Sequence, residues 1–379
     1  MIFDYETMRL IGWGLLGALL IGFAITGGFD LGVAILLPFL GKNDTERRVI
    51  INSIGATWEG NQVWFITAGG ALFAAWPLAY AVAFSGFYFA LLLTLFALFL
   101  RPIGFDYRSK LPSQRWRNNW DIALFIGGLV PALIFGVAFG NLLSGVPFHF
   151  DNEMRIFYTG SFWALLNPFS LLAGVVSLGM LTAHGAVYLQ LKSEGDIHQR
   201  CKSLLPMLIG ITLLAFALAG IWVANLDGYQ INSVIQPNAP SDPLSKQVTQ
   251  APGLWLENYK RNPVLWLIPC LAFTSGMASV VLSKLDRPGL AFISSSLTLV
   301  SIILTAGVAM FPFLIPSSSS FSSSLTVWDA SASHATLSII LWVTVIFLPI
   351  VLTYTSWVFR VLRGKITAEQ IQTNDHTAY

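Results

Sequence analysis

The chain has 379 residues, of which 55% are hydrophobic and only 11% are charged, and its formal net charge is +2. Soluble domains usually carry about 25% charged residues, so a water-soluble chain of this composition would expose a very apolar surface. In a membrane, by contrast, lipid-facing side chains can be apolar. The composition therefore indicates an integral membrane protein, and the small net charge argues against nucleic acid as a partner.

Stretches of about 20 apolar residues predict transmembrane helices. Nine such stretches indicate an all-α polytopic membrane protein in which residues 1–379 form a single integral membrane domain. The first and the fifth are long enough to tilt or to extend into the interface. The predicted spans are 11–40, 54–73, 77–100, 121–143, 160–191, 203–226, 263–283, 289–312 and 338–359.

Lysine and arginine are unevenly divided between the two sets of loops that nine spans create. Sixteen of the 21 lie after spans one, three, five and seven or in the C-terminal tail, and five lie in the other set. Because cytoplasmic loops are enriched in these residues, we expect the N-terminus outside and the C-terminus in the cytoplasm. The long loops 227–262 and 313–337 are then outside, and the serine run 316–324 is expected to be a flexible connector.

Two carboxylates fall inside predicted spans, where an ionisable group costs roughly 2.5–3.5 kcal/mol at the membrane centre. Asp30 lies in GGFDLG near the inner end of the first span, and Glu59 lies in WEGNQVW, about two turns into the second. These spans are antiparallel neighbours, so both carboxylates are expected in the cytoplasmic half of the membrane. Two interpretations stay open: a helix cap or ion-pair partner, or a proton or ion path.

The segment LRPIGFDYRSK closes the third predicted span on the cytoplasmic side. We expect Pro102 to break the helix and to leave Asp106 among Arg101, Arg108 and Lys110. A carboxylate among cations stays ionised and attracts protons and water. One compensating acid among cytoplasmic cations would give the same pattern, so this interpretation also stays open.

Residues that could hold haem or a metal ion are scarce. His184 is the one histidine inside a predicted span, and no second histidine lies at ligand-like helical spacing from it. Cys201 and Cys270 are far apart and form neither a CxxC site nor a disulfide framework. We therefore expect no cofactor or metal ion held by ligands of this chain. Trp58 and Trp64 lie within the second span and are expected to face protein.

The chain contains a series of distinctive stretches from one end to the other: NDTERRVIINSIG (43–55), WEGNQVWFITAGGALFAAWP (58–77), AFSGFYFA (83–90), RPIGFDYRSK (101–110), RWRNNW (115–120), GVAFGNLLSGVPF (136–148), LNPFSLLAGVVSLGM (166–180) and TAGVAMFPFLIPSS (305–318). Together they resemble subunit II of the cytochrome bd ubiquinol oxidases. The resemblance covers the whole length of the chain.

This resemblance implies two four-helix bundles plus one peripheral helix, which agrees with nine spans. It implies a quinol:oxygen oxidoreductase of the aerobic respiratory chain in the bacterial inner membrane, in which this subunit is not catalytic alone. Haem b and haem d would lie in the partner, subunit I. A structural quinone, lipids and a small single-span subunit are further expected partners. The chain would support assembly and oxygen access to the haems, with Trp58 and Trp64 as candidate oxygen-access or haem-facing residues.

The family's cytoplasmic proton route implies roles for Asp106, Lys110 and the C-terminal Tyr379 in this chain. Glu59 stands where the family has a membrane-embedded acid. We expect Glu59 to be desolvated between helices and to receive protons that are collected at Asp106.

The first span departs from the family pattern, which usually reads TDGFD where this chain reads TGGFD. Gly27 therefore replaces an acid that precedes Asp30. Either that acid is dispensable, or Asp30 and Glu59 share its role in the proton path.

An autonomous proton-coupled transporter is the alternative function. Transporters usually place broken helices and polar binding groups near the membrane midplane in corresponding repeats. Spans six to eight of this chain carry essentially no ionisable residues in their interiors. That pattern favours the oxidase subunit.

Overall fold

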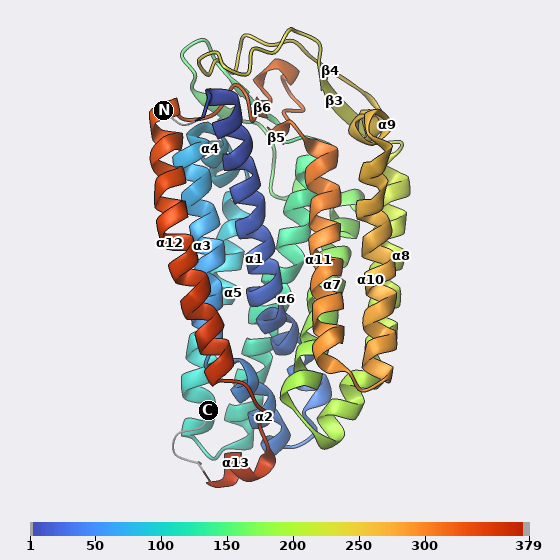
Figure 1. Cartoon of the computed structure of the whole chain (residues 1–379). Helices are drawn as coiled ribbons and strands as arrows, with labels where there is room; N and C mark the ends of the chain where they lie inside the picture. The colour runs from blue at the N-terminus through green and yellow to red at the C-terminus, as the bar shows by residue number, and fades with distance from the viewer. Residues whose placement is uncertain (1–2, 374–379) are drawn as a thin grey trace.

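The computed structural model describes residues 3–373, which form mainly long α-helices that lie side by side (Figure 1). Short two-stranded sheets lie at one end of the bundle, called the upper end, and α2 and α13 lie at the lower end. The long helices are α1 (Tyr5–Leu40), α3 (Trp58–Ala75), α5 (Tyr88–Tyr107), α6 (Gln114–Ser144), α7 (Pro168–Lys192), α8 (Gly195–Val223), α10 (Leu267–Lys284), α11 (Pro288–Met310) and α12 (His334–Val361). The short helices are α2 (Asp44–Gly55), α4 (Pro77–Gly86), α9 (Glu257–Arg261) and α13 (Ala368–Thr373). The antiparallel strand pairs are β1 (Phe148–Phe150) with β2 (Ile156–Tyr158), β3 (Asp227–Ile231) with β4 (Val248–Pro252), and β5 (Phe313–Ile315) with β6 (Leu325–Thr326).

Within residues 3–373, eight helices are long and apolar enough to cross a membrane. They correspond to eight of the nine predicted spans, so the all-α polytopic fold is confirmed. The remaining span, predicted at 54–73, corresponds to α3, whose 18 residues lie beside α1 and α12. The polar residues in its first two turns lower its hydropathy. A total of nine spans therefore stays a prediction.

The residues between the first two predicted spans form helix α2 rather than a loop. Asn43 caps this helix, because its side chain accepts a hydrogen bond from the backbone N–H of Glu46 at 2.9 Å. Helix α2 then buries Ile50 and Ile54 against the lower end of the bundle. Because α2 is a separate element, α3 begins later than predicted, and Glu59 lies in its first turn instead of two turns inside a span.

The third predicted span is bent and longer than expected. Helix α4 leads through a bend at Phe87 into α5, which continues past Pro102 into a 3₁₀ turn (Arg108–Lys110). A proline removes one intrahelical hydrogen bond, and packing of the flanking turns can offset that loss. A Cβ on Gly104 would lie 2.8 Å from the side chain of Leu124, so the turn after the proline is pressed against α6. The prediction that Pro102 breaks the helix is therefore wrong.

Helix α1 packs against α3, α6, α7 and α11, and so links the two sides of the molecule. Helices α7, α8, α10 and α11 pack on one another as a group, to the right in Figure 1. Helix α12 lies at the edge, where it packs on α1 and α3. These contacts support the predicted arrangement of two four-helix bundles and one peripheral helix, which itself stays a prediction.

Helices α1 and α7 cross with their backbones in contact. A Cβ on Gly32 would lie 2.1 Å from the carbonyl oxygen of Leu181, and a Cβ on Gly185 would lie 2.5 Å from the carbonyl carbon of Gly32. Residues without a side chain allow membrane helices to approach this closely. The crossing fixes the position of Asp30, which lies two residues before Gly32 in α1.

The serine run at the upper end is ordered by its own hydroxyl groups. Ser317 and Ser324 are fully buried, and the backbone N–H of Ser317 donates to Ser324 Oγ at 2.9 Å. Ser319 Oγ donates to the carbonyl oxygen of Phe148 at 2.6 Å. Because the serine hydroxyls pair with backbone groups, the run that connects β5 to β6 is held in one position. The expectation of a flexible connector is wrong.

Arg9 ties the start of α1 to both long loops of the upper end. Its guanidinium is fully buried, with Nε donating to Ser331 Oγ at 2.8 Å and Nη2 donating to Ser241 Oγ at 3.0 Å. The guanidinium carbon lies 3.6 Å from the centroid of the Tyr5 ring. This arginine therefore anchors the loops over the bundle.

Candidate functional site

Asp30 is buried in the interior of the helix bundle. Its side chain belongs to α1, exposes 0% of its surface and accepts a hydrogen bond at Oδ2 from Nδ2 of Asn61, at 2.9 Å. The other oxygen, Oδ1, has no hydrogen-bond partner among the described residues. The hydrogen bond between Asn61 and Asp30 joins α1 to the start of α3 and leaves one carboxylate oxygen of Asp30 unpaired.

Arg101 brings a positive charge to the same interior. It lies in α5, exposes 1% of its surface, and passes so close to Gly127 of α6 that a Cβ there would lie 2.8 Å from Arg101 Cγ. The guanidinium carbon lies 5.6 Å from the centroid of Trp58 and interacts electrostatically with Asp30. The prediction that Arg101 lies in a cytoplasmic loop beside Asp106 is wrong, because α5 continues through this position.

Glu59 faces away from this interior. Successive residues of an α-helix are about 100° apart, so a helix that turns Asn61 toward Asp30 turns the residue two positions earlier to the opposite side. The Glu59 side chain is accordingly exposed on this chain. An apolar stripe continues from it up the same face of α3 as Val63, Ile66 and Phe73, which expose 51%, 69% and 59% of their surface. In this chain alone, Glu59 is exposed, so the expectation that its own helices desolvate it is wrong.

Trp58 and Trp64 both contact helices of this chain. The Trp58 ring lies 5.4 Å from the ring of Phe105, centroid to centroid. The Trp64 ring lies against Gly22 of α1, where a Cβ would be 2.7 Å from it. The expectation that these two residues face protein is confirmed, and a role toward haem or oxygen stays a prediction.

Asp106 and Lys110 lie exposed at the lower end, in the last turn of α5 and in the 3₁₀ turn. Among the described residues, the Asp106 side chain makes no hydrogen bond or ion pair. The predicted ring of cations around it is wrong, because Arg101 lies in the interior and Arg108 turns toward α6. Tyr379 lies outside the described residues.

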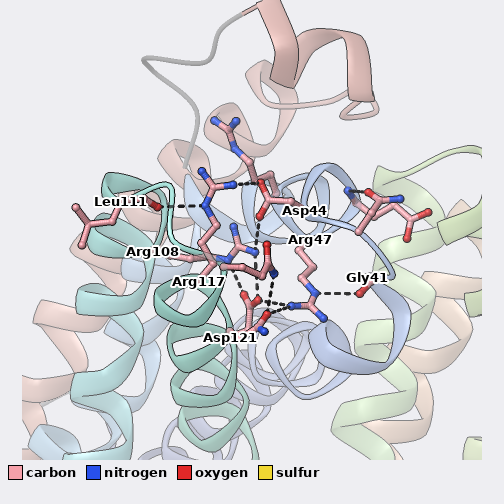
Figure 2. Close-up of polar contacts among 12 residues, drawn as sticks. Gly41, Asp44, Arg47, Arg108, Leu111, Arg117 and Asp121 are labelled. Carbon is pink, nitrogen blue, oxygen red and sulfur yellow. Dashed lines mark hydrogen bonds and ion pairs between the residues drawn. The ribbon is translucent and has the colours of Figure 1, made fainter.

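Arg108 belongs instead to an ion cluster that joins α2, α6 and the 3₁₀ turn (Figure 2). Its Nε lies 2.5 Å from Oδ1 of Asp121, and its Nη2 lies 3.0 Å from Oδ1 of Asp44. Arg47 Nη1 lies 2.8 Å from Oδ2 of Asp121, and Arg117 Nη1 lies 2.7 Å from Oδ2 of Asp44. Two carboxylates thus hold three guanidinium groups and fasten α2 to α6.

Sequence reasoning missed this ion cluster, because its members come from three separate elements. Asp44 and Arg47 lie in a segment that was expected to be a loop, and Asp121 was placed only as the first residue of a span. The one available signal was an acid at the start of an apolar stretch that follows a run of arginines. That signal predicts a partner but does not say which one.

His184 is fixed by hydrogen bonds at both ring nitrogens. Nε2 lies 3.0 Å from the carbonyl oxygen of Ile25, which can only accept, so Nε2 carries a proton, and Nδ1 lies 2.8 Å from Ser295 Oγ. The ring also stacks on Phe292, with centroids 4.7 Å apart. Since both nitrogens are engaged, His184 does not fit the role of a haem ligand.

Gly27 lies one turn before Asp30 in α1, at a position with little room for a side chain. A Cβ on Gly27 would lie 2.4 Å from the ring of Phe23, so any larger residue requires that ring to move. Phe23 in turn packs on Phe65 and Phe135. The packing of these aromatic rings therefore accommodates a glycine at position 27, where the family that the sequence resembles has an acid.

The family described as cytochrome bd terminal oxidase subunit II matches residues 8–362 of the chain. The chain belongs to this family. Cytochrome bd-I ubiquinol oxidase subunit 2 of Escherichia coli strain K12 is 54% identical over 377 residues, which cover 99% of this chain and 100% of that protein. The probable cytochrome oxidase subunit 2 of Haemophilus influenzae is 50% identical over 376 residues, with coverages of 99% and 100%.

The fold agrees with that of a solved bd oxidase. A chain in the structure of bd oxidase from Geobacillus thermodenitrificans superimposes with a TM-score of 0.68 at 16% identity, covering 94% of this chain and 98% of that one. Family membership makes the present chain one subunit of a bd-type quinol oxidase, with a subunit I as its partner. It is a multi-pass protein of the inner membrane and not an autonomous transporter.

Proposed function

We propose that this chain is the haem-free subunit of a ubiquinol:oxygen oxidoreductase, in which it supports assembly and delivers cytoplasmic protons to the haems of subunit I. The name of the Escherichia coli relative supports ubiquinol as the electron donor. The two hydrogen bonds of His184 support the haem-free role, because they engage both ring nitrogens. Haem b and haem d are then held by ligands of subunit I.

The observation that carries the proton-delivery role is the exposed face of α3. Glu59 lies at the lower end of the apolar stripe formed by Val63, Ile66 and Phe73. An ionisable side chain on a surface that faces lipid has a high free-energy cost, so we infer that subunit I covers this face. Glu59 would then lie at the junction of the two subunits, where an acid can pass protons from one to the other.

The proposed route begins at the lower surface with Asp106 and Lys110, which are exposed where the cytoplasm is expected. Tyr379 would assist from the tail, and Glu59 would receive the proton. Asp30 would take part from the interior through Asn61, whose amide reaches its carboxylate.

The remaining expectations extend this proposal. The N-terminus would be periplasmic and the C-terminus cytoplasmic. Trp58 and Trp64 would line the oxygen-access or haem-facing side. A structural quinone, lipids and a small single-span subunit would complete the complex.

Purification of the tagged chain in mild detergent tests the assignment of the haems. We expect a haem-bearing partner to copurify with b- and d-type spectra, and the chain expressed alone to show no haem absorbance. His184→Ala should leave both spectra unchanged. Loss of one haem from an otherwise assembled His184→Ala complex would contradict the haem-free role.

A further inference from the structure

Three polar atoms of Asp30 and Arg101 have no hydrogen-bond partner among the described residues. They are Oδ1 of Asp30 and the Nε and Nη2 atoms of Arg101, whose side chains expose 0% and 1% of their surface. Buried polar atoms in proteins are nearly always paired, and unpaired charged ones are the most costly. An acceptor and two donors therefore interact electrostatically here without a hydrogen bond between them.

Neighbouring side chains do not supply the missing partners. The amide of Asn61 already donates to the other oxygen of Asp30. The hydroxyl of Tyr188, which also interacts with Asp30, donates to a backbone carbonyl of α2 at 3.0 Å. Trp58 presents its ring to Arg101. The missing group must both donate to a carboxylate and accept from a guanidinium, and a water molecule does both.

We propose that ordered water bridges Asp30 and Arg101, and that Arg101 is a positioning residue for proton exchange at Asp30. This inference rests on the proposed function, in which protons pass through this subunit. The guanidinium stays protonated in proteins, so Arg101 orients the water and does not carry the proton. The carboxyl group of Asp30 exchanges its proton with that water.

A density map of the purified complex, at a resolution that shows water, tests the bridge itself. We expect density within hydrogen-bond distance of both Asp30 Oδ1 and the Arg101 guanidinium, and its loss in Arg101→Met. A direct ion pair, or a quinone or lipid headgroup at this place, would overturn the proposal. This readout is independent of turnover, so failure of the bridge and failure of the proposed function are distinguishable.

Turnover of assembled complexes, measured per haem, tests the positioning role. Arg101→Met should lower quinol oxidase turnover about tenfold, and Arg101→Lys, which keeps a cation, should restore part of it. Because the two residues act through one water, Asp30→Asn combined with Arg101→Met should be no slower than the slower single variant. Effects that multiply, or unchanged turnover per haem in Arg101→Met, would overturn the role.

Arg115→Met is the matched control for the change of charge. Arg115 lies in α6 and is exposed at the lower end, away from Asp30 and Arg101 in the interior. We expect its turnover per haem to equal that of the unmodified complex. A loss as large as that of Arg101→Met would assign the effect to net charge and would overturn the positioning role.

Discussion

At the scale of single residues, Asp121 holds two arginines at the lower end of the bundle, a role that its predicted position as the first residue of a span does not indicate. Its two oxygens lie 2.5 Å from Arg108 Nε and 2.8 Å from Arg47 Nη1, and both Asp121 and Arg108 are buried. Removing one partner of a buried ion pair leaves the other charge without compensation. Asp121 therefore stabilises the position of Arg108 and, through Arg47, that of α2.

We predict that Asp121→Asn destabilises the complex by about 3–5 kcal/mol, because it leaves buried arginine charge uncompensated. Thermal unfolding of the detergent-solubilised complex measures this change. Glu153→Gln is the control, since Glu153 forms a solvent-exposed pair with Arg155 at 3.1 Å and such pairs contribute about 0–1 kcal/mol. Equal stability losses in the two variants would contradict the role given to the buried cluster.

At the scale of helices, the contact between α1 and α7 depends on the absence of side chains at Gly32 and Gly185. We predict that Gly32→Ala destabilises the complex by about 1–3 kcal/mol or more, because the new methyl group would meet the backbone of α7. Gly17→Ala on the same helix is the control, since a Cβ there meets nothing within 4 Å. Thermal unfolding of both variants measures the difference, and a tolerated Gly32→Ala would mean that the helices separate at little cost.

Hydropathy predicted the long apolar helices well, since a helix that crosses a membrane needs a continuous run of apolar residues. It did not predict α2, because that helix buries one face only and carries charges on its other side. It also ended the third span at residue 100, before Arg101, since a charge followed by proline normally marks a helix end. In the structure the helix continues through Arg101, whose buried side chain interacts electrostatically with Asp30.

The candidate site was predictable only in part, for similar reasons. The residue types and the family resemblance identified Asp30, Glu59 and Asp106 as candidates. The direction in which each side chain points depends on the rotation of its helix about the helix axis, which these signals do not determine. Asn61 and Arg101 were not among the predicted proton-path residues, because an amide and a buried guanidinium become notable only when the fold places them beside Asp30.

At the scale of the whole molecule, the predicted orientation in the membrane rests on the uneven distribution of lysine and arginine. We predict that reporters fused within 227–262 report the outside and that fusions at the C-terminal tail report the cytoplasm. Fusions on either side of α3 give the most information, since α3 is not among the eight helices of residues 3–373 that are long and apolar enough to cross a membrane. A tail reporter active outside would show that one predicted span, most readily α3, does not cross the membrane.

The proposed proton delivery through the exposed face of α3 requires one residue, one helix face and one subunit interface to act together. Asp106→Asn should have a mild effect, since Lys110 and water can replace an exposed collector. Glu59 has no such substitute at the proposed junction.

Quinol oxidase turnover of the Glu59→Gln complex is the most direct test. The amide preserves the size of the side chain and removes its titration. With haem content normal, we predict that turnover falls roughly 100-fold, the scale of a lost general acid or base. Full turnover in a well-assembled Glu59→Gln complex would contradict proton delivery through this subunit at Glu59.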